Sequence, residues 1–347
     1  MYISEWLMWF GDSVSAPIRR KWQMPKLAKH LRPSDFRRNY TKIKVSDNPR
    51  PIGPYYAYND SYLEIRGGRG EHFRGIITLL GLVLFLIPFS YAYLAIKMIA
   101  RIVTNQESDL APAILFVSFY SLLFIIFGYF FIYYYRHICR FELFTLRHIR
   151  VRFNRVTQQV FIQRPKHCGG TVVFRWKDIM PINTDSHHSN QEQSQFVNIF
   201  YFPSYKTGLP FTDGFSIGKN TNRPQDNRDE WEFIRRYMET GLAGLPKPRL
   251  TTTLPLPFRG WQEQIKPIFD VFNQTPKLVS YLILIPSLIF ILPLLSLGYF
   301  LSECLCWQFK WPEAIQEAGK IGRLKPKETQ LLDYPVTIWK NQVDDNS

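Results

Sequence analysis

The amino-acid sequence predicts an α+β membrane protein, in which a transmembrane helical hairpin precedes a β-rich domain and a further membrane segment follows it. Three observations support this class: two uncharged apolar runs, a change from helical to alternating periodicity, and a third apolar block interrupted by prolines. The mean hydropathy of -0.16 hides these features, because it averages long apolar blocks with strongly basic stretches.

The first two apolar runs, within residues 75–135, predict the transmembrane hairpin. The run 75–100 has no charged residue before Lys97, and the run 110–135 has none at all. Each exceeds the roughly 20 residues that a helix needs to cross a bilayer. The link between them is short and polar, so we expect two antiparallel helices.

Positive charges flank the outer ends of this hairpin, whereas its link carries Glu107 and Asp109. Cations beside membrane spans favour the cytoplasmic side. The link is therefore expected in the periplasm of a bacterial inner membrane, and the basic region 1–74 and the domain after the hairpin in the cytoplasm. The flanking cations are Arg66, Arg69 and Arg74 before the hairpin, and Arg136, Arg140, Arg147, Arg150 and Arg152 after it.

The formal net charge of +15 fits this membrane topology. Much of the excess lies beside the apolar runs, where it serves orientation and contact with anionic lipid headgroups. We therefore expect the lipid bilayer as a partner and no nucleic acid.

The third apolar block, residues 278–301, contains Pro286 and Pro293 and has basic residues on both sides. A single kinked span fits its length. Two half-helices that enter and leave on one side would instead keep both basic flanks in the cytoplasm. The length favours the single span, and the side on which the tail 302–347 lies stays open. A proline-rich linker is expected at 242–277.

The β-rich domain is predicted at residues 141–241. Apolar and polar residues alternate at 150–153 and 171–176, and a later strand is expected at 195–202. A helix closes the domain, with Asn227 as a suitable N-cap and Gly241 at its end. The side chains expected on the apolar face of this helix are Trp231, Ile234, Tyr237 and Met238. A small sandwich or barrel closed by one amphipathic helix follows from this pattern.

Two local patterns are similar to those of a proteobacterial family of unknown function. The first begins at Ile149 with IRVRFNR and continues as VFI at 160–162 and VVFRWKDI at 172–179. The second is WPEAI at 311–315. The order of elements also resembles that of pleckstrin-homology-like (PH-like) domains of bacterial membrane proteins. The resemblance covers roughly residues 60 to 320.

Members of that family carry a membrane hairpin ahead of the domain, and their genes often lie beside those of type VI secretion effectors. The resemblance therefore implies a membrane-anchored binding protein, and most concretely an immunity protein that neutralises a co-encoded effector toxin by direct binding. The alternative is a secretion or transport accessory, such as an effector chaperone or membrane adaptor, which binds lipid headgroups or protein through the PH-like domain.

The candidate lipid-binding or partner-binding residues are Arg150, Arg152, Arg155 and Lys177. They are expected either to be solvated strand residues or to form a basic patch for anionic headgroups. Three tryptophans are expected to be structural: Trp176 as a core anchor, together with Trp231 and Trp311.

The sequence contains no motif typical of catalysis, a cofactor or a metal, such as a phosphate-binding loop or a nucleophile elbow. His187 and His188 are adjacent, which is typical of a solvated loop rather than a metal site. His167 and Cys168 are neighbours in a hairpin and are expected to point to opposite faces. We therefore expect no enzyme activity, no catalytic residue, no cofactor and no metal.

Overall fold

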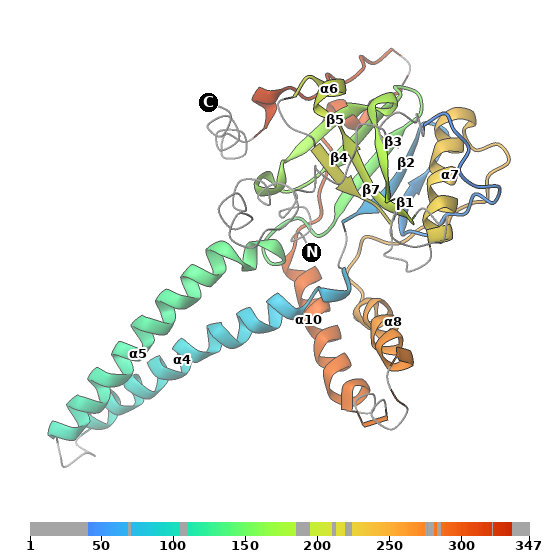
Figure 1. Cartoon of the computed structure of the whole chain (residues 1–347). Coiled ribbons are helices and arrows are strands. Elements are labelled where there is room, and N and C mark those ends of the chain that lie inside the picture. The colour runs from blue at the N-terminus through green and yellow to red at the C-terminus, as the bar shows by residue number, and fades with distance from the viewer. Residues whose placement is uncertain are drawn as a thin grey trace. The chain divides into compact units, whose positions relative to one another are not determined.

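The computed structural model (Figure 1) describes most of the chain in two compact units. Unit 1 comprises residues 1–70, 148–254 and 308–347, and unit 2 comprises residues 71–147 and 255–307. The residues described within them are 41–68, 71–104, 110–184, 195–209, 213–218, 224–274, 276, 281–282, 286–320 and 322–334. The mixed α+β class is confirmed.

Unit 1 contains a five-stranded antiparallel sheet whose strands follow one another in chain order. The predicted strands at 150–153 and 171–176 are confirmed as β3 and β5, and the quoted VFI segment lies in β4. The strands are β1 (Tyr55–Tyr58), β2 (Tyr62–Gly67), β3 (Ile149–Asn154), β4 (Gln159–Gln163) and β5 (Thr171–Arg175).

Strands β1 and β2 lie in the region that the sequence marked only as basic. They pair with each other. Strand β2 also pairs with β3, with Leu63 opposite Phe153, although the whole membrane hairpin separates these two strands in the sequence. Strand β1 is short, and prolines and a glycine precede it, so local periodicity gives little signal there.

The two faces of this sheet carry different side chains, because successive residues of a strand point to opposite faces. On β3, Val151 and Phe153 are fully buried in the core. Trp176 packs edge-on against Phe153 and stacks on Trp231, with ring centroids 5.9 and 5.3 Å apart. The predicted core role of Trp176 and the structural role of Trp231 fit these positions. Arg152 and the other alternate residues of β3 face away from this core.

A second, three-stranded antiparallel sheet and one long helix complete the core of unit 1. Helix α7 begins at Pro224, three residues before the predicted N-cap Asn227, because proline suits the first turn of a helix. It ends at Gly241, as predicted, with φ of 80°. Its predicted apolar face is confirmed as buried. The elements are β6 (Met180–Thr184), β7 (Gln195–Phe202), α6 (Ser204–Thr207), β8 (Asp213–Ser216) and α7 (Pro224–Thr240).

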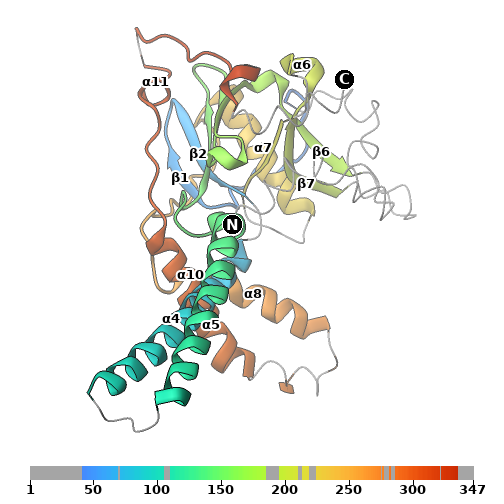
Figure 2. The same cartoon turned by 90° about the vertical axis from the view of Figure 1, so that its left-hand side faces the viewer.

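Unit 2 is helical, and three of its helices are long and apolar enough to cross a membrane. Helices α4 and α5 form the predicted antiparallel hairpin (Figures 1 and 2). The other helices are α8 and α10, with the π-helical segment η5 leading into α10. Their bounds are α4 (Ile76–Val103), α5 (Leu110–His137), α8 (Arg259–Gln274), η5 (Ser287–Ile291) and α10 (Leu292–Leu305).

The helices of unit 2 bury small residues and expose large apolar ones. Gly81 and Ala95 of α4 and Ala113 of α5 are buried, whereas Leu86 is 55% exposed and Leu115 is 71% exposed. Helices that associate in lipid pack through small residues, and lipid tails contact the large apolar side chains. This distribution indicates a membrane protein.

The third apolar block, expected as a single span at 278–301, overlaps the third helix that is long and apolar enough to cross a membrane. The helix that could cross a membrane begins at Ser287 and ends at Leu305. The segment 242–277, predicted as a proline-rich linker, contains α8. Trp261, Ile265 and Phe269 recur there at helical spacing, a signal that sequence reasoning missed.

Helices α4 and α10 meet at Gly75 and Gly298. A Cβ atom added to Gly298 would lie 2.6 Å from the Gly75 carbonyl oxygen and 2.7 Å from Leu79 Cγ. Gly75 has φ of 101°, a backbone conformation that favours glycine. The close approach of the two helices therefore depends on the absence of side chains at both positions.

Replacing Gly298 with Ala is expected to destabilise the full chain by about 1–3 kcal/mol, because the added methyl overpacks this crossing. Thermal unfolding of the detergent-solubilised protein would measure the loss. Gly128→Ala on α5 is the matched control, since no atom lies within 4 Å of a Cβ built there. Equal melting temperatures for the two variants would contradict a tight contact between α4 and α10.

Candidate functional site

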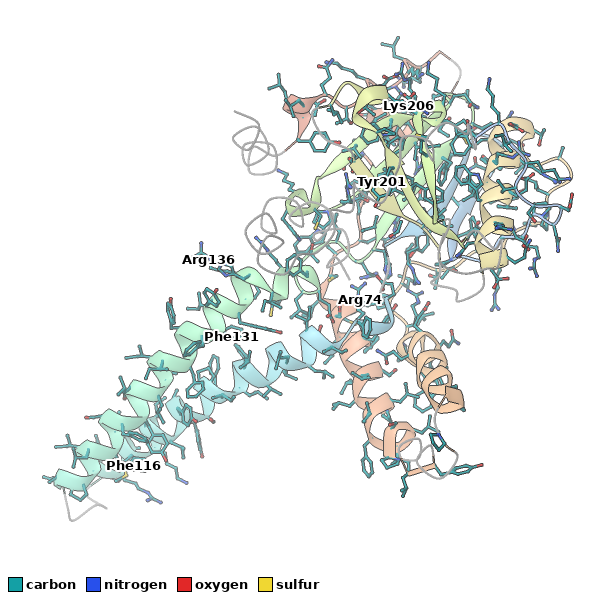
Figure 3. The ribbon with its side chains drawn as sticks, in the orientation of Figure 1. Arg74, Phe116, Phe131, Arg136, Tyr201 and Lys206 are labelled. Carbon is teal, nitrogen blue, oxygen red and sulfur yellow. The ribbon has the colours of Figure 1, made fainter. Side chains whose placement is uncertain are left out.

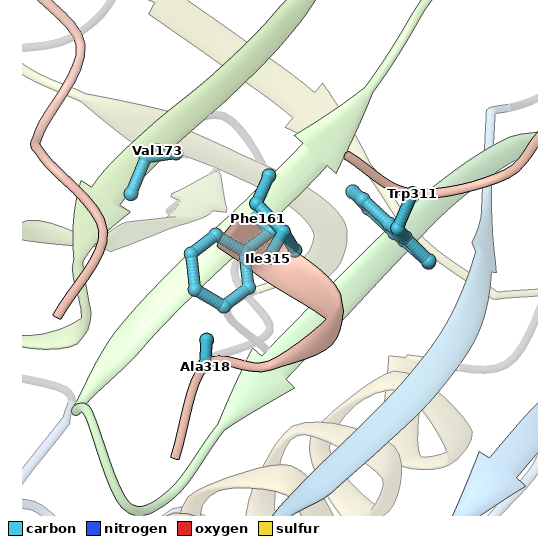
Figure 4. Packing of buried hydrophobic residues seen from close by; sticks show 5 residues of the cluster. All are labelled: Phe161, Val173, Trp311, Ile315 and Ala318. Atoms are coloured by element: carbon cyan, nitrogen blue, oxygen red, sulfur yellow. The ribbon is translucent and has the colours of Figure 1, made fainter. Parts of the chain in front are cut away.

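The segment that follows α10 lies across the polar face of the five-stranded sheet. We call it the C-terminal strap, the described residues between Trp311 and Tyr334, which include the short helix α11 (Glu313–Gln316). Figure 2 shows α11 and α7 on opposite sides of this sheet. The apolar side chains of the strap pack on two strand residues, as Figure 4 shows for Phe161, Val173, Trp311, Ile315 and Ala318.

Hydrogen bonds fix the strap along its length. Asn154 Nδ2 donates to the Ala318 carbonyl at 2.8 Å, and Gln159 Nε2 donates to that of Pro326 at 2.8 Å. At the edge strand β5, Thr329 N donates to the Val173 carbonyl at 3.0 Å, and Val173 N donates to Thr329 Oγ1 at 2.7 Å. The strap is therefore an integral part of unit 1.

Glu64 of β2 is the centre of a charged cluster beneath the strap. Arg152 donates to its carboxylate through Nη2 at 2.9 Å and Nε at 3.1 Å, and Arg150 donates through Nη1 at 3.1 Å. The indole Nε1 of Trp311 donates to the same carboxylate at 3.0 Å. Glu64 is 3% exposed and Arg152 is 6% exposed. Two cations thus share one buried anion.

Aromatic rings cover the arginines of this cluster. The Arg152 guanidinium carbon lies 4.1 Å from the ring centroid of Tyr62 and 4.8 Å from that of Trp311. Arg150 lies over the ring of Tyr56 at 5.2 Å. A desolvated cation gains energy from the face of such a ring. The rings therefore help to hold the second positive charge of the cluster.

The structure brings two of the four predicted cations together and separates the other two from them. Arg150 and Arg152 converge on Glu64, so the expectation that Arg152 is a solvated strand residue is wrong. Arg155 donates from Nε to the Asp60 carbonyl at 3.0 Å. Lys177 is exposed, in the turn that follows β5. The role of these cations in binding anionic headgroups stays a prediction.

Sequence reasoning did not include Glu64. It belongs to the alternating stretch Tyr62–Gly67, in which Leu63 and Ile65 are fully buried on the core face. That alternation was the available signal for a strand whose other face is polar. Nothing local to the stretch indicates that its partners lie on β3 and on the strap.

A second buried ion pair ties the end of the strap to the smaller sheet. Arg164 donates to Asp213 Oδ1 at 2.9 Å and Oδ2 at 2.8 Å, and the Tyr334 hydroxyl donates to Oδ2 at 2.7 Å. The side chains of Arg164 and Asp213 are fully buried. Burial raises the pKa of Tyr334 well above its usual value, and the charge of Asp213 raises it further. Tyr334 is therefore a neutral donor at physiological pH.

Unit 2 contains its own buried charges where α4 begins beside α10 (Figure 3). The carboxylate of Glu142 accepts hydrogen bonds from the first turn of α4, from Gly75 N, Ile77 N at 3.2 Å and Thr78 Oγ1 at 2.7 Å. A carboxylate at this position satisfies unpaired amides and complements the helix dipole. Arg74 donates from Nε to Ser302 Oγ at 2.9 Å.

Arginines also join the ends of α8 and α10. Arg259 at the start of α8 donates to Glu303 Oε1 at 2.9 Å, and both side chains are buried. Arg147 Nε donates to the Glu303 carbonyl at 2.9 Å. Burial by itself would lower the pKa of Arg74, but the negative charge of Glu71 and other neighbouring acidic groups raise it. Arg74 thus remains charged, and the hydrogen bonds of the three arginines serve as structural ties.

The other candidate residues do not form a shared site in the described part of the chain. His167 and Cys168 lie in the 3-10 turn η3 (Lys166–Cys168) rather than on a strand, so the opposite-face argument does not apply to them. Cys168 is fully buried. His187 and His188 lie outside the described residues. Within the described ranges, no group of three or more His, Cys, Asp or Glu side chains is placed to hold a metal ion.

Comparison with known proteins places the chain in a family. No curated protein and no solved structure matches it. A family model described as "Family of unknown function (DUF6708)" matches residues 124–321, more than half of the chain. The matched region begins within α5 and ends in the strap, so it includes Arg150, Arg152 and Trp311 of the charged cluster, whereas Glu64 precedes it. The chain therefore belongs to the DUF6708 family.

Proposed function

We propose that this protein is a multi-pass protein of a bacterial inner membrane that acts by binding, and most concretely that it is an immunity protein which neutralises a co-encoded type VI secretion effector. The observation that carries the proposal is the Glu64 cluster. Arg152 and Trp311, which belong to the two patterns shared with the family, both donate to Glu64 inside unit 1. They therefore stabilise a scaffold. A scaffold of this kind presents its outer surface to a partner.

The domain organisation supports the same proposal. Five antiparallel strands, three further antiparallel strands and the closing helix α7 are compatible with a PH-like domain. The basic flanks of the α4–α5 hairpin favour the cytoplasm for this domain. We propose that a delivered effector meets it there, at the inner face of the membrane.

Deleting the gene is expected to leave cells viable alone but sensitive to sister cells that deliver the neighbouring effector, because the toxin then finds no occupying partner. A competition assay measures survival, and the intact chain supplied in trans should restore it. Copurification of the effector with the full chain in detergent would measure direct binding.

Protection by binding the effector and protection by catalysis predict different results for a histidine variant. The triple substitution His167→Gln, His187→Gln and His188→Gln removes the candidate acid–base groups and leaves the buried Cys168 in place. Protection by this variant at normal protein levels fits occupancy. Loss of protection from a stable, membrane-inserted triple variant would instead favour catalysis.

The alternative function is a secretion accessory that binds lipid headgroups or an effector. The observation that favours it is a run of exposed cations on the strap, where Lys320, Arg323, Lys325 and Lys327 face solvent with Lys177 exposed elsewhere in unit 1. Such a run attracts anionic lipid. If deletion abolishes export of the neighbouring effector without sensitising the cells, the accessory function is favoured.

A further inference from the structure

We infer that α8 and α10 form a re-entrant hairpin, which enters the membrane from the side of unit 1 and returns to that side. The partner of its exposed apolar surface is then the acyl region of the adjacent leaflet. This topology also assigns the C-terminal strap to the same side of the membrane as the sheet that it covers. Among the described residues, the end of α4 at Val103 and the start of α5 at Leu110 then lie on the opposite side.

The two ends of the hairpin segment lie next to each other. In unit 1, Gln308 Nε2 donates to Thr253 Oγ1 at 2.8 Å, which joins the residues just before and just after the segment. In unit 2, Glu303 accepts from Arg259 at 2.9 Å and from Leu256 N at 3.4 Å. A segment that crossed once would separate its ends by the thickness of the hydrocarbon core, about 30 Å.

The strap supplies an independent constraint on the return side. Trp311 is only a few residues beyond α10, and its indole binds Glu64 of the sheet. Thr329 then pairs with Val173 on the edge strand. These contacts form inside one folded unit, so the chain on both sides of the hairpin must reach that unit without crossing the bilayer between them.

The two arms run antiparallel. Ser296 Oγ donates to the Pro257 carbonyl at 3.3 Å, and Gln264 Nε2 donates to that of Leu295 at 3.4 Å. Gly260 allows close packing, since a Cβ atom there would lie 2.8 Å from Tyr299 Cβ. From Arg259 through Gly260 to Gln264 the partners on α10 are Glu303, Tyr299 and Leu295, so the two helices run in opposite directions. Figure 1 shows them side by side.

The length of α8 fits partial insertion. Helix α8 has 16 residues and α4 has 28. At a rise of about 1.5 Å per residue, α8 extends only about 24 Å, whereas α4 extends about 42 Å. The sequence of α8 also contains Glu263, Lys266 and Asp270, which disfavour a complete crossing.

The exposed side of the hairpin carries large apolar side chains, and α10 packs on the membrane helix α4. Gly298 of α10 contacts Gly75 and Leu79 at the start of α4. The buried side of α10 includes Ser296 and Ser302. The exposed large side chains of η5 and α10 are Ile289, Phe290, Ile291, Leu294, Leu297 and Leu305, and those of α8 are Trp261 and Phe269. A helix with a polar buried side and an apolar exposed side fits a lipid environment.

Cysteine labelling of the full chain in sealed membranes tests this topology. The background is Cys304→Ser, which removes the exposed cysteine among the described residues, and the other three cysteines are buried. Single cysteines are introduced by Lys247→Cys before the hairpin, Lys325→Cys after it and Val103→Cys at the far end of α4. All three positions are exposed. A membrane-impermeant maleimide is applied to spheroplasts and to inverted vesicles.

Lys247→Cys and Lys325→Cys are expected to react from the same side, and Val103→Cys from the opposite side only. Reaction of Lys325→Cys from the side of Val103→Cys would overturn the re-entrant topology. Tyr281→Cys, near the turn of the hairpin, should react only after detergent solubilisation. Its reaction from either side of intact membranes would overturn insertion into one leaflet. The background chain without added cysteine controls for labelling of the buried thiols.

Discussion

Replacing Glu64 with Gln is expected to destabilise the protein by about 3–5 kcal/mol, the range for removing one partner of a buried ion pair. The substitution keeps the size of the side chain but leaves Arg152 without its negative partner. Arg152 is 6% exposed, and the strap prevents water from replacing the lost charge. Trp311 keeps an acceptor in the amide oxygen, so the loss is mainly electrostatic.

The measurement is thermal unfolding of the full chain in detergent, followed by tryptophan fluorescence and by protease resistance of unit 1. Glu313→Gln on the strap is the matched control, because it removes the same charge at an exposed position. The control is expected to change stability by less than about 0.5 kcal/mol. A Glu64→Gln variant as stable as this control would show that the arginines do not depend on the carboxylate.

The same experiment separates charge from packing at the strap. Trp311→Phe keeps a ring over Arg152 but removes the indole donor to Glu64. It is expected to destabilise the chain less than Glu64→Gln, by about 1–3 kcal/mol, because one hydrogen bond to the carboxylate and part of the packing are lost while both ion pairs remain.

The elements with strong local periodicity could be predicted from the sequence. Strands β3 and β5 alternate apolar and polar residues, and the apolar face of α7 repeats at helical spacing. The α4–α5 hairpin was evident from two uncharged runs joined by a short link. In each case the pattern depends on residues close in sequence, which is the information that a single sequence contains.

The parts that depend on distant pairing could not be predicted. Glu64 and Trp311 are separated by 247 positions, and β2 reaches β3 only after the complete membrane hairpin. The sequence shows that Arg150 and Arg152 are cations but not that one buried carboxylate binds both. An arginine on a strand is compatible with solvent, lipid or a buried partner, and only the position of Glu64 distinguishes them.

The third membrane segment shows the same limit. Its length favoured a single span, because an apolar run of that size is sufficient to cross a bilayer. The re-entrant hairpin that we propose rests instead on contacts that join Thr253 to Gln308 and Arg259 to Glu303. None of these four residues belongs to the apolar block, so its composition does not contain the information.

The fully buried pair of Arg164 and Asp213 provides the second large expected effect. Asp213→Asn should destabilise the protein by about 3–5 kcal/mol, since it leaves the Arg164 guanidinium buried without a counter-charge. Burial by itself would lower the pKa of Arg164, and Asp213 holds it above its ordinary value. Arg164 is therefore charged in the parent protein. In Asp213→Asn the high ordinary pKa of a guanidinium keeps it charged at neutral pH, so losing a proton does not relieve the loss of its partner.

Tyr334→Phe is the graded control for this pair, because it removes one donor to Asp213 and leaves the ion pair intact. It should reduce stability by about 1–3 kcal/mol at neutral pH. The raised pKa of Tyr334 means that the folded state favours the neutral phenol, so its contribution is present below about pH 10 and is lost as the pH rises above that value. Unfolding at a series of pH values should therefore bring the Phe variant and the parent closer together above about pH 10. A constant difference across that range, or an Asp213→Asn variant no weaker than Tyr334→Phe, would contradict a buried charge network at the end of the strap.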